Sequence, residues 1–234
     1  FPQLKHHAPH EEIYLCIANY SGRELSFESD ALNAILGIFA VFEQRHQMRH
    51  IWGMPYMSVC EGHDTLDNTK KPSMWYSLGF ETLYGAIRRK AFPSWSWLGW
   101  NEVQSWPSWW LLINDAAYVL NIQPELVSGS IISWSDYENN YSGHARYDSQ
   151  LSRFIHIQAH MSSIVSFVWR SIELADGTML YSATPADHLK YLERVKRCPN
   201  KFLLIHMPLH YHSPARYRHL LVEDCGDHWE RVAM

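Results

Sequence analysis

Apolar positions recur at helical spacing in the first hundred residues of the chain. One stripe at intervals of three and four residues is formed by Leu32, Ile35, Leu36, Phe39 and Phe42. Such a stripe puts apolar side chains on one face of a helix, so it predicts a helix over about 30–47. Asp30, or Ser29 before it, is the predicted N-cap, because a short acceptor side chain can bond the free N–H groups of the first turn.

Two neighbouring stretches have weaker patterns. Residues 1–12 are polar and contain proline, which predicts a loop, and the apolar run 13–20 has no clean period and fits a helix or a short strand. A second helix is predicted over 74–90, with Trp75, Leu78, Leu83 and Ile87 as candidate buried positions. The basic run Arg88-Arg89-Lys90 would then stand at the helix C-terminus, where positive charge complements the helix dipole.

Beyond residue 100 the pattern changes to short apolar or alternating segments, which predict strands over 131–135, 154–160, 163–169, 201–207, 217–223 and 229–232. Asp176-Gly177 and Gly226-Asp227 are typical turn dipeptides. The segments from 201 to 232 predict an antiparallel meander, and 186–197 predicts one amphipathic helix between strands. The fold class is therefore α+β, with a helical N-terminal portion packed on a β-rich, mainly antiparallel C-terminal portion. We expect a single unit over 1–234, with 1–100 mainly helical and 101–234 mainly β.

A tryptophan-rich connector, residues 92–100, joins the two portions. Trp95 and Trp97 alternate in what reads as an extended segment, so both would point to one face, and Trp100 follows Gly99. Burying these indoles would fasten the helices to the sheet. The alternative is that they line a pocket or a recognition surface, since tryptophan is favoured at binding hot spots.

Composition narrows the classes of partner. Aromatic residues make up 14% and charged residues 19% of the chain, which favours a well-packed core over disorder. The net charge of −4 and scattered Lys and Arg give no basic surface for nucleic acid. The sequence contains no apolar run of about 18 residues, so no membrane span is predicted. The widely spaced cysteines Cys16, Cys60, Cys198 and Cys225 indicate reduced thiols and a cytoplasmic location.

The sequence contains no local catalytic or cofactor-binding signature. G-x-S-x-G, G-x-G-x-x-G and G-x-x-x-x-G-K-[ST] are missing, and Cys60, His63 and Asp64 are only sequence neighbours. We therefore expect neither catalytic residues nor a cofactor. One alternative is a metal-dependent hydrolase that uses a histidine-rich loop, with His206, His210 and His212 as candidate ligands. Another is a protein-interaction platform with exposed Trp106, Trp109 and Trp110.

Three stretches taken together resemble one known family. Residues 20–38 (YSGRELSFESDALNAILGI) are similar to Y-x-x-R-x-L-[ST]-x-x-x-D-x-L-N-A-[FI]-x-G-I, residues 50–55 (HIWGMP) to F-I-W-G-L-P, and residues 88–100 (RRKAFPSWSWLGW) to R-R-x-x-F-P-S-W-S-W-A-G-W. These patterns follow the HET domain in fungal heterokaryon-incompatibility proteins, and their order and spacing agree. The matching positions, expected to be structural, are Arg23, Asp30, Leu32, Asn33, Gly37, Trp52, Gly53, Pro55, Arg88, Arg89, Pro93, Trp95, Trp97, Gly99 and Trp100.

The resemblance implies a role in fungal self/non-self recognition and programmed cell death. Segments typical of the HET domain itself, such as A-L-S-Y-x-W-G and R-G-W-T-x-Q-E, do not occur in this sequence. The chain is thus expected to be the accessory or regulatory region that follows such a domain, and any activity is expected in that upstream domain. Its expected partners are the HET domain of the same protein and other proteins, with no nucleic acid and no membrane.

Overall fold

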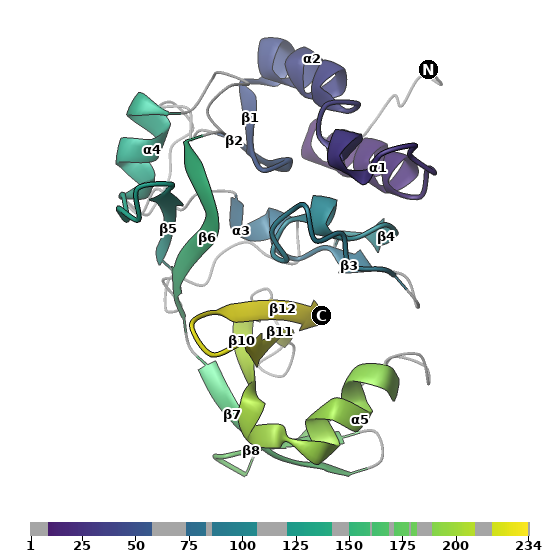
Figure 1. Cartoon of the computed structure of the whole chain (residues 1–234), viewed down its shortest axis with the longest axis vertical. Coiled ribbons are helices and arrows are strands. Elements are labelled where there is room, and N and C mark those ends of the chain that lie inside the picture. The colour runs from purple at the N-terminus through teal and green to yellow at the C-terminus, as the bar shows by residue number, and fades with distance from the viewer. Residues whose placement is uncertain are drawn as a thin grey trace.

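The computed structural model of the chain is an α+β fold with helices mainly at the N-terminal end and the largest sheet at the C-terminal end (Figure 1). The residues that the structure describes are 9–57, 74–82, 86–106, 121–141, 150–159, 161–168, 171–177, 179–181, 189–208 and 217–233. The predicted fold class is therefore confirmed.

The N-terminal part consists of two helices and a hairpin. Helix α1 covers Pro9–Ser21, a 3₁₀ turn η1 covers Glu28–Ala31, and helix α2 covers Leu36–His46. Strands β1 (Met48–Ile51) and β2 (Met54–Met57) follow as an antiparallel pair. The ambiguous run 13–20 is thus helical, and the predicted loop 1–12 is wrong for residues 9–12.

The predicted helix 30–47 is confirmed only from Leu36 onward, and the predicted N-cap is wrong. Neither η1 nor α2 has a side-chain cap bond. The Tyr20 hydroxyl donates to the Ala31 carbonyl oxygen at 2.9 Å, and the Ile35 N–H bonds the Leu32 carbonyl oxygen instead. Since a tertiary contact takes the carbonyl that the first α-helical turn would use, the regular helix begins later.

The predicted helix over 74–90 is wrong. Among the described residues of this range, 74–82 and 86–90, the one helix is the short α3, Met74–Ser77, followed by strand β3, Glu81–Thr82, which pairs with β4, Val103–Ser105. Arg88 forms an isolated antiparallel bridge with Trp100, and the 3₁₀ turn η2 covers Trp97–Gly99. The guanidinium groups of Arg88 and Arg89 donate to backbone carbonyl oxygens of the connector. This arrangement needs an extended chain rather than a helix end.

Strands dominate after residue 120. Strand β5 (Asn121–Leu126) pairs with β6 (Leu151–Gln158), and helix α4 (Trp134–Asn140) lies between them in sequence. The strand predicted at 131–135 is therefore wrong, because the Ser133 side chain accepts the Asp136 N–H at 3.0 Å and caps a helix there. The strands predicted at 154–160 and 163–169 are confirmed as β6 and β7 (Met161–Val168), with boundaries shifted by one to three residues.

A six-stranded antiparallel sheet closes the fold. Its order is β12-β11-β10-β7-β8-β9, with β8 at Ser171–Leu174, β9 at Met179–Tyr181, β10 at Phe202–Pro208, β11 at Tyr217–Asp224 and β12 at Trp229–Ala233. The predicted meander β10-β11-β12 is confirmed, as is the amphipathic helix, which is α5 at Leu189–Arg197. Gly177 and Gly226 have φ angles of 82° and 101°, as the predicted turns require.

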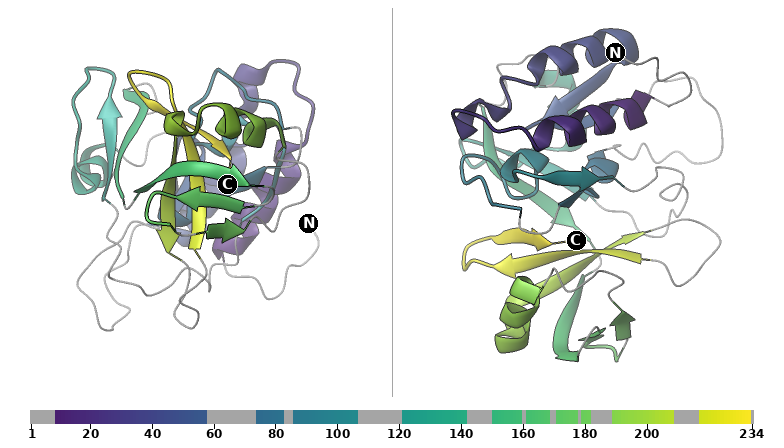
Figure 2. Two further views of the ribbon diagram at one scale, coloured as in Figure 1. Left: turned by 90° about the horizontal axis from the view of Figure 1, so that it is seen from below. Right: turned by 90° about the vertical axis from the view of Figure 1, so that its right-hand side faces the viewer.

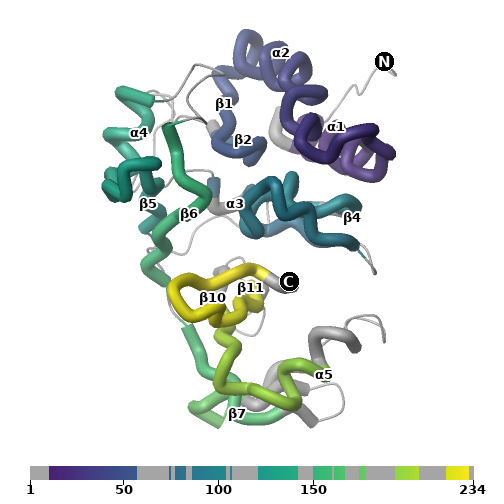
Figure 3. Tube along the Cα trace, in the orientation of Figure 1, coloured from purple at the N-terminus to yellow at the C-terminus, as the bar shows by residue number. Residues whose placement is uncertain are grey.

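One large core connects the two ends of the molecule. Figure 2 shows α1 and α2 at one end, the β3 and β4 region in the middle and the C-terminal sheet at the other end. The main apolar cluster runs from Ile13 of α1 through the connector to Leu220 of β11. The tube in Figure 3 shows how β6 leads from the helical end to the sheet, where β7 continues it. No helix in the described ranges is both long and apolar enough to span a bilayer.

Candidate functional site

The connector 92–100 lies in the interior of the molecule. Trp97 is 0%, Trp100 3% and Trp95 8% exposed, which confirms the predicted burial. Each indole N–H has a backbone acceptor, because buried polar groups need partners. Trp97 Nε1 donates to the Gly53 carbonyl oxygen at 2.6 Å, Trp100 Nε1 to that of Ser94 at 2.9 Å, and Trp95 Nε1 to that of Arg153 at 3.0 Å.

The turn between β1 and β2 is locked to this connector. The Ser96 hydroxyl donates to the Trp52 carbonyl oxygen at 2.6 Å, beside the Trp97–Gly53 bond. Gly53 has φ +73°, and a Cβ there would lie 2.7 Å from Leu98 Cδ1. Glycine is therefore required at this position both by the backbone and by the close packing. Trp52 itself donates from Nε1 to the Ser152 carbonyl oxygen of β6 at 3.0 Å.

Two arginines connect the third motif stretch to itself and to the first. Arg88 donates from Nη2 to the Phe92 carbonyl oxygen at 2.8 Å and from Nη1 to that of Gly99 at 3.1 Å. Arg89, 4% exposed, donates from Nη1 to the Trp100 carbonyl oxygen at 2.7 Å and from Nη2 to that of Ser21 at 3.4 Å. Burial lowers the pKa of Arg89, and the nearby Glu28 carboxylate partly offsets this.

The remaining contacts complete one buried joint between the stretches 20–38, 50–55 and 88–100, which we call the motif joint. Tyr20 meets the Trp97 ring edge-on with centroids 6.0 Å apart. Pro55 and Pro93 are buried, and Leu32 packs against the same core. A Cβ on Gly99 would lie 2.8 Å from Arg88 Nη1 and would collide with the Pro93 carbonyl oxygen.

Four residues of the first stretch lie on the surface instead. Arg23, Asp30, Asn33 and Gly37 are exposed. Within the described part of the chain, the side chains of Arg23, Asp30 and Asn33 form no hydrogen bond or ion pair. A Cβ on Gly37 would touch nothing. Together with Phe27, which is 69% exposed, these residues form what we call the 22–37 surface, and the fold alone gives no reason for their identities.

A groove lies next to the connector, between β6 and β12. It consists of two adjoining cavities of about 580 and 520 Å³. They share a wall made of Ser94, Trp95, Phe154, Ile155, His228 and Trp229. Phe154 and Trp229 are 42% and 45% exposed, and Met161, at 53%, lines the larger cavity. Trp95 is thus buried yet contributes to the wall, so the joint and the groove share residues of the stretch 88–95.

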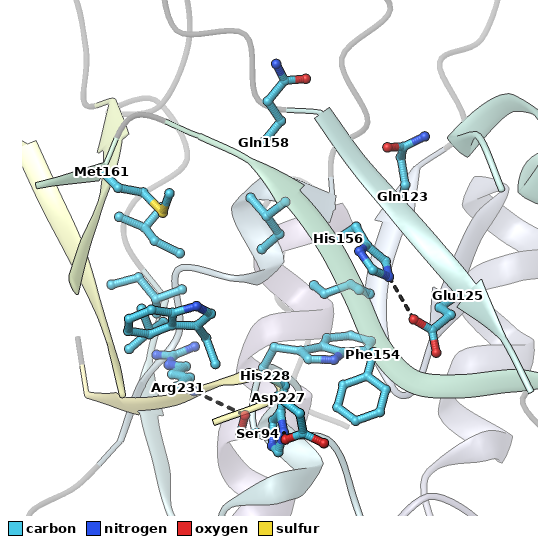
Figure 4. A pocket seen from close by; sticks show the side chains of 17 residues that line it. Ser94, Gln123, Glu125, Phe154, His156, Gln158, Met161, Asp227, His228 and Arg231 are labelled. Atoms are coloured by element: carbon cyan, nitrogen blue, oxygen red, sulfur yellow. Dashed lines mark hydrogen bonds and ion pairs between the residues drawn. The ribbon is translucent and has the colours of Figure 1, made fainter. Parts of the chain in front are cut away.

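Two histidines in the larger cavity are each held by a carboxylate. His156 Nε2 lies 2.7 Å from Glu125 Oε2, and Figure 4 shows this pair on one side with Met161 on the other. His228 Nδ1 lies 2.6 Å from Asp227 Oδ1, and its ring meets Phe154 with centroids 5.1 Å apart. The hydrogen bond to Asp227 raises the pKa of His228 against the opposing effect of burial.

The basic residues Lys90 and Arg153 line the smaller cavity. The Arg153 guanidinium donates to the Lys90 carbonyl oxygen, which fixes its position. No ion pair of either residue occurs among the described residues. Glu230, which also lines this cavity, lies 3.6 Å from His228 Nε2.

The groove has no activated nucleophile among its described residues. Ser94 Oγ accepts the Arg231 N–H at 3.1 Å, and neither Ser94 nor Cys225 is hydrogen-bonded to a histidine there. Burial, followed by Glu230 and Glu223, raises the pKa of Cys225, which disfavours the thiolate. Arg231, which also lines the larger cavity, donates from its guanidinium to the carbonyl oxygens of Leu78 and Phe80.

The other predicted candidates are placed only in part. His206 lies on β10 opposite His219 of β11, while His210, His212, Cys60 and His63 lie outside the described residues. Within the described ranges no group of three His, Cys, Asp or Glu residues could hold a metal. Trp106 stacks on Tyr14 with centroids 4.8 Å apart and donates to the Ser77 carbonyl oxygen at 3.1 Å, whereas Trp109 and Trp110 also lie outside.

Comparison with known proteins gave no match to any family model, any curated protein or any solved structure. The groove was not predicted from the sequence, because its walls come from the connector, β5, β6 and β12. The available signal was the alternation of Phe154 and His156 on a predicted strand, followed far along the chain by the Asp227-His228-Trp229 turn.

Proposed function

We propose that this chain is the accessory, non-catalytic region of a fungal heterokaryon-incompatibility protein. In this role it docks against an upstream HET domain and positions or restrains it. The protein would thereby take part in self/non-self recognition that ends in programmed cell death.

The observation that carries the proposal is the convergence of the three stretches that resemble the family. They are separated by up to about seventy residues in sequence, yet Arg89 donates to the carbonyl oxygens of Ser21 and Trp100. Trp97 and Ser96 donate to those of Gly53 and Trp52. A chance likeness in three short segments gives no reason for those segments to pack together. A shared structural unit does.

The 22–37 surface supports the docking role. Residues of the resemblance that are buried have a structural purpose, whereas Arg23, Asp30 and Asn33 are exposed and make no side-chain bonds to the described residues. Gly37 has open space around it, so a neighbouring domain could approach the backbone of α2 closely there. An arginine, two polar side chains and an exposed Phe27 match the composition of interface hot spots and rims.

Co-purification tests this proposal. The coding sequence upstream of Phe1 is expressed as a separate tagged polypeptide together with residues 1–234. We expect the two to co-purify, and the triple variant Arg23→Ala/Asp30→Ala/Asn33→Ala to lose at least about ten-fold in affinity, which requires the three truncations together to cost only about 1.4 kcal/mol. Lys201→Gln, an exposed change just before strand β10, is the matched control and should bind normally.

Two outcomes would contradict the proposal. One is an upstream sequence without a segment like A-L-S-Y-x-W-G. The other is fungal cell death when residues 1–234 are expressed alone, because that would place a death-triggering activity in this chain.

A further inference from the structure

The groove between β6 and β12 has the features of a ligand site that the motif joint and the 22–37 surface do not share. From its shape, apolar walls and charge distribution we infer that it binds an extended peptide that carries carboxylates at one end and a large apolar side chain next to them. This site is separate from the proposed docking of an upstream domain, so it stands or falls independently.

The size of the groove favours a chain-like ligand. Each of the two cavities, about 580 and 520 Å³, already has the volume of a pocket for a whole drug-sized molecule. They adjoin along Phe154, His228 and Trp229, so a ligand that fills both must be elongated. An extended peptide advances about 3.3 Å per residue and presents side chains alternately, which suits a groove with two lobes.

The walls offer apolar anchors. Ten large hydrophobic side chains are exposed at described positions, and three of them, Phe154, Met161 and Trp229, line this one groove. Figure 4 shows Phe154 beside His228 at one end of the larger cavity and Met161 across from it. The edge-on contact of Phe154 and His228 holds the Phe154 ring in place, so it loses little freedom when a partner side chain packs on it.

Charge decides which peptide fits. The smaller cavity is lined by Lys90 and Arg153, whose charges face no described carboxylate at ion-pair distance, so acidic side chains of a ligand would find partners there. Glu230 lines the same cavity, where it lies near His228, and Glu125 and Asp227 line the larger cavity. These carboxylates would repel the continuous phosphate backbone of a nucleic acid, in line with the chain's net charge of −4, but they tolerate a peptide whose acids are confined to one end.

Fluorescence anisotropy with purified residues 1–234 tests the inference. Three fluorescein-labelled octapeptides serve as probes: one with two aspartates followed by leucine and phenylalanine in a serine background, one with lysines replacing the aspartates, and one with serines replacing leucine and phenylalanine. We expect the first to bind at least about ten-fold more tightly than either of the others, a difference of about 1.4 kcal/mol. Lys90→Gln/Arg153→Gln should remove the preference for aspartate over lysine.

Substitutions of the apolar wall residues test whether a large apolar side chain of the peptide packs in the groove. Phe154→Ser and Trp229→Ser should each weaken the acidic peptide by about ten-fold or more, whereas Ile131→Ser, a comparably exposed residue outside the groove, and Lys201→Gln should not. Melting temperatures show that each variant is folded. Equal binding of the aspartate and lysine peptides, or unchanged binding by both the charge and the apolar variants, would overturn the inference. Displacement of the peptide by adenosine monophosphate but not by unlabelled peptide would do so as well.

Discussion

Two glycines of this chain, Gly99 and Gly37, have opposite surroundings, so a side chain would have opposite effects at the two positions. Gly99 has an ordinary backbone conformation, yet a side chain there would strike the Pro93 carbonyl oxygen and the Arg88 guanidinium, which are fixed by their own bonds. Gly37 stands near the start of α2 with nothing within 4 Å of where its Cβ would be. The interior therefore demands glycine at one position, and only an outside partner would demand it at the other.

Substituting both glycines tests this contrast. We expect Gly99→Ala to lower the free energy of unfolding by about 2–3 kcal/mol, as overpacking of a rigid site does. Gly37→Ala should leave stability unchanged or raise it by about 0.5 kcal/mol, because alanine is the better helix former. Urea unfolding followed by tryptophan fluorescence gives both values. A Gly99→Ala protein as stable as the natural sequence would mean that the connector is loosely packed.

The buried His50 side chain makes the stability of the folded chain depend on pH. Its ring packs on Phe39 with centroids 4.5 Å apart, and its Nδ1 is shielded from solvent with no hydrogen-bond partner among the described residues. Burial lowers the pKa of His50 from 6.5 to about 4. Because the unfolded chain takes up this proton at higher pH than the folded one, the folded state loses stability as pH falls from about 6.5 to 4.

The expected loss is about 2 kcal/mol, somewhat less than the full pKa difference implies because the ring is not completely buried. His50→Phe keeps the ring packing and removes the titration. Denaturant unfolding at pH 7 and pH 4.5 should show a smaller loss for His50→Phe than for the natural chain, while carboxylate titrations affect both alike. Equal losses in the two proteins would show that His50 is accessible to protons in the folded state.

At the scale of elements, the connector acts as a brace between the β1–β2 turn, strand β6 and the sheet. Trp97 and Ser96 hold the turn, Trp95 holds β6, and Ser94 accepts the backbone N–H of Arg231 in β12. These bonds reach three different elements from four consecutive residues. The connector therefore organises its surroundings although it has almost no regular structure itself.

Trp97→Phe measures this bracing. The substitution retains most of the apolar volume but leaves the buried Gly53 carbonyl without its indole donor, so we expect a loss of about 2–3 kcal/mol. Trp229→Phe, at a position that is 45% exposed, should cost less than about 1 kcal/mol. Thermal unfolding followed by circular dichroism compares the two. Similar losses would mean that the Trp97 hydrogen bond adds nothing beyond the burial of a ring.

Local patterns predicted the strands better than the helices. In β6, β7 and the β10–β12 meander, alternation and turn glycines agree with the tertiary structure, so the sequence alone was sufficient. Over 74–90 helical spacing was outweighed by bonds that sequence reasoning does not see, such as those from Arg88 and Arg89 to connector carbonyls. At 131–135 a strand was predicted, but Ser133 caps a helix there by accepting the Asp136 N–H.

The candidate sites differ in the same way. Burial of Trp95, Trp97 and Trp100 was predicted from the alternation of Trp95 and Trp97 and from the area that indoles bury, and the structure confirms it. The groove could not be predicted, since Lys90, Phe154 and Trp229 are brought together only by the packing of the connector between β6 and β12. Arg153 illustrates the point, because its role depends on a carbonyl more than sixty residues earlier in the chain.

For the whole molecule, the motif joint lies between the helical and the stranded ends. The main core cluster contains residues of α1, α2, the connector and the sheet, and Arg231 of β12 reaches the carbonyl oxygens of Leu78 and Phe80 in the middle of the molecule. The guanidinium also lies over the Phe80 ring, 3.5 Å from its centroid. We expect such shared contacts to make the two ends unfold together.

Hydrogen exchange of the Gly99→Ala variant tests the structural role of the motif joint most directly. Peptic fragments from α2 and from the β10–β11 pair lie on opposite sides of the joint and do not contain the substitution. If the joint unites the molecule, the amides of both fragments lose protection by the same factor, about 30-fold or more for the expected 2–3 kcal/mol. Loss of protection confined to residues 86–106, with α2 and the sheet unchanged, would contradict this account.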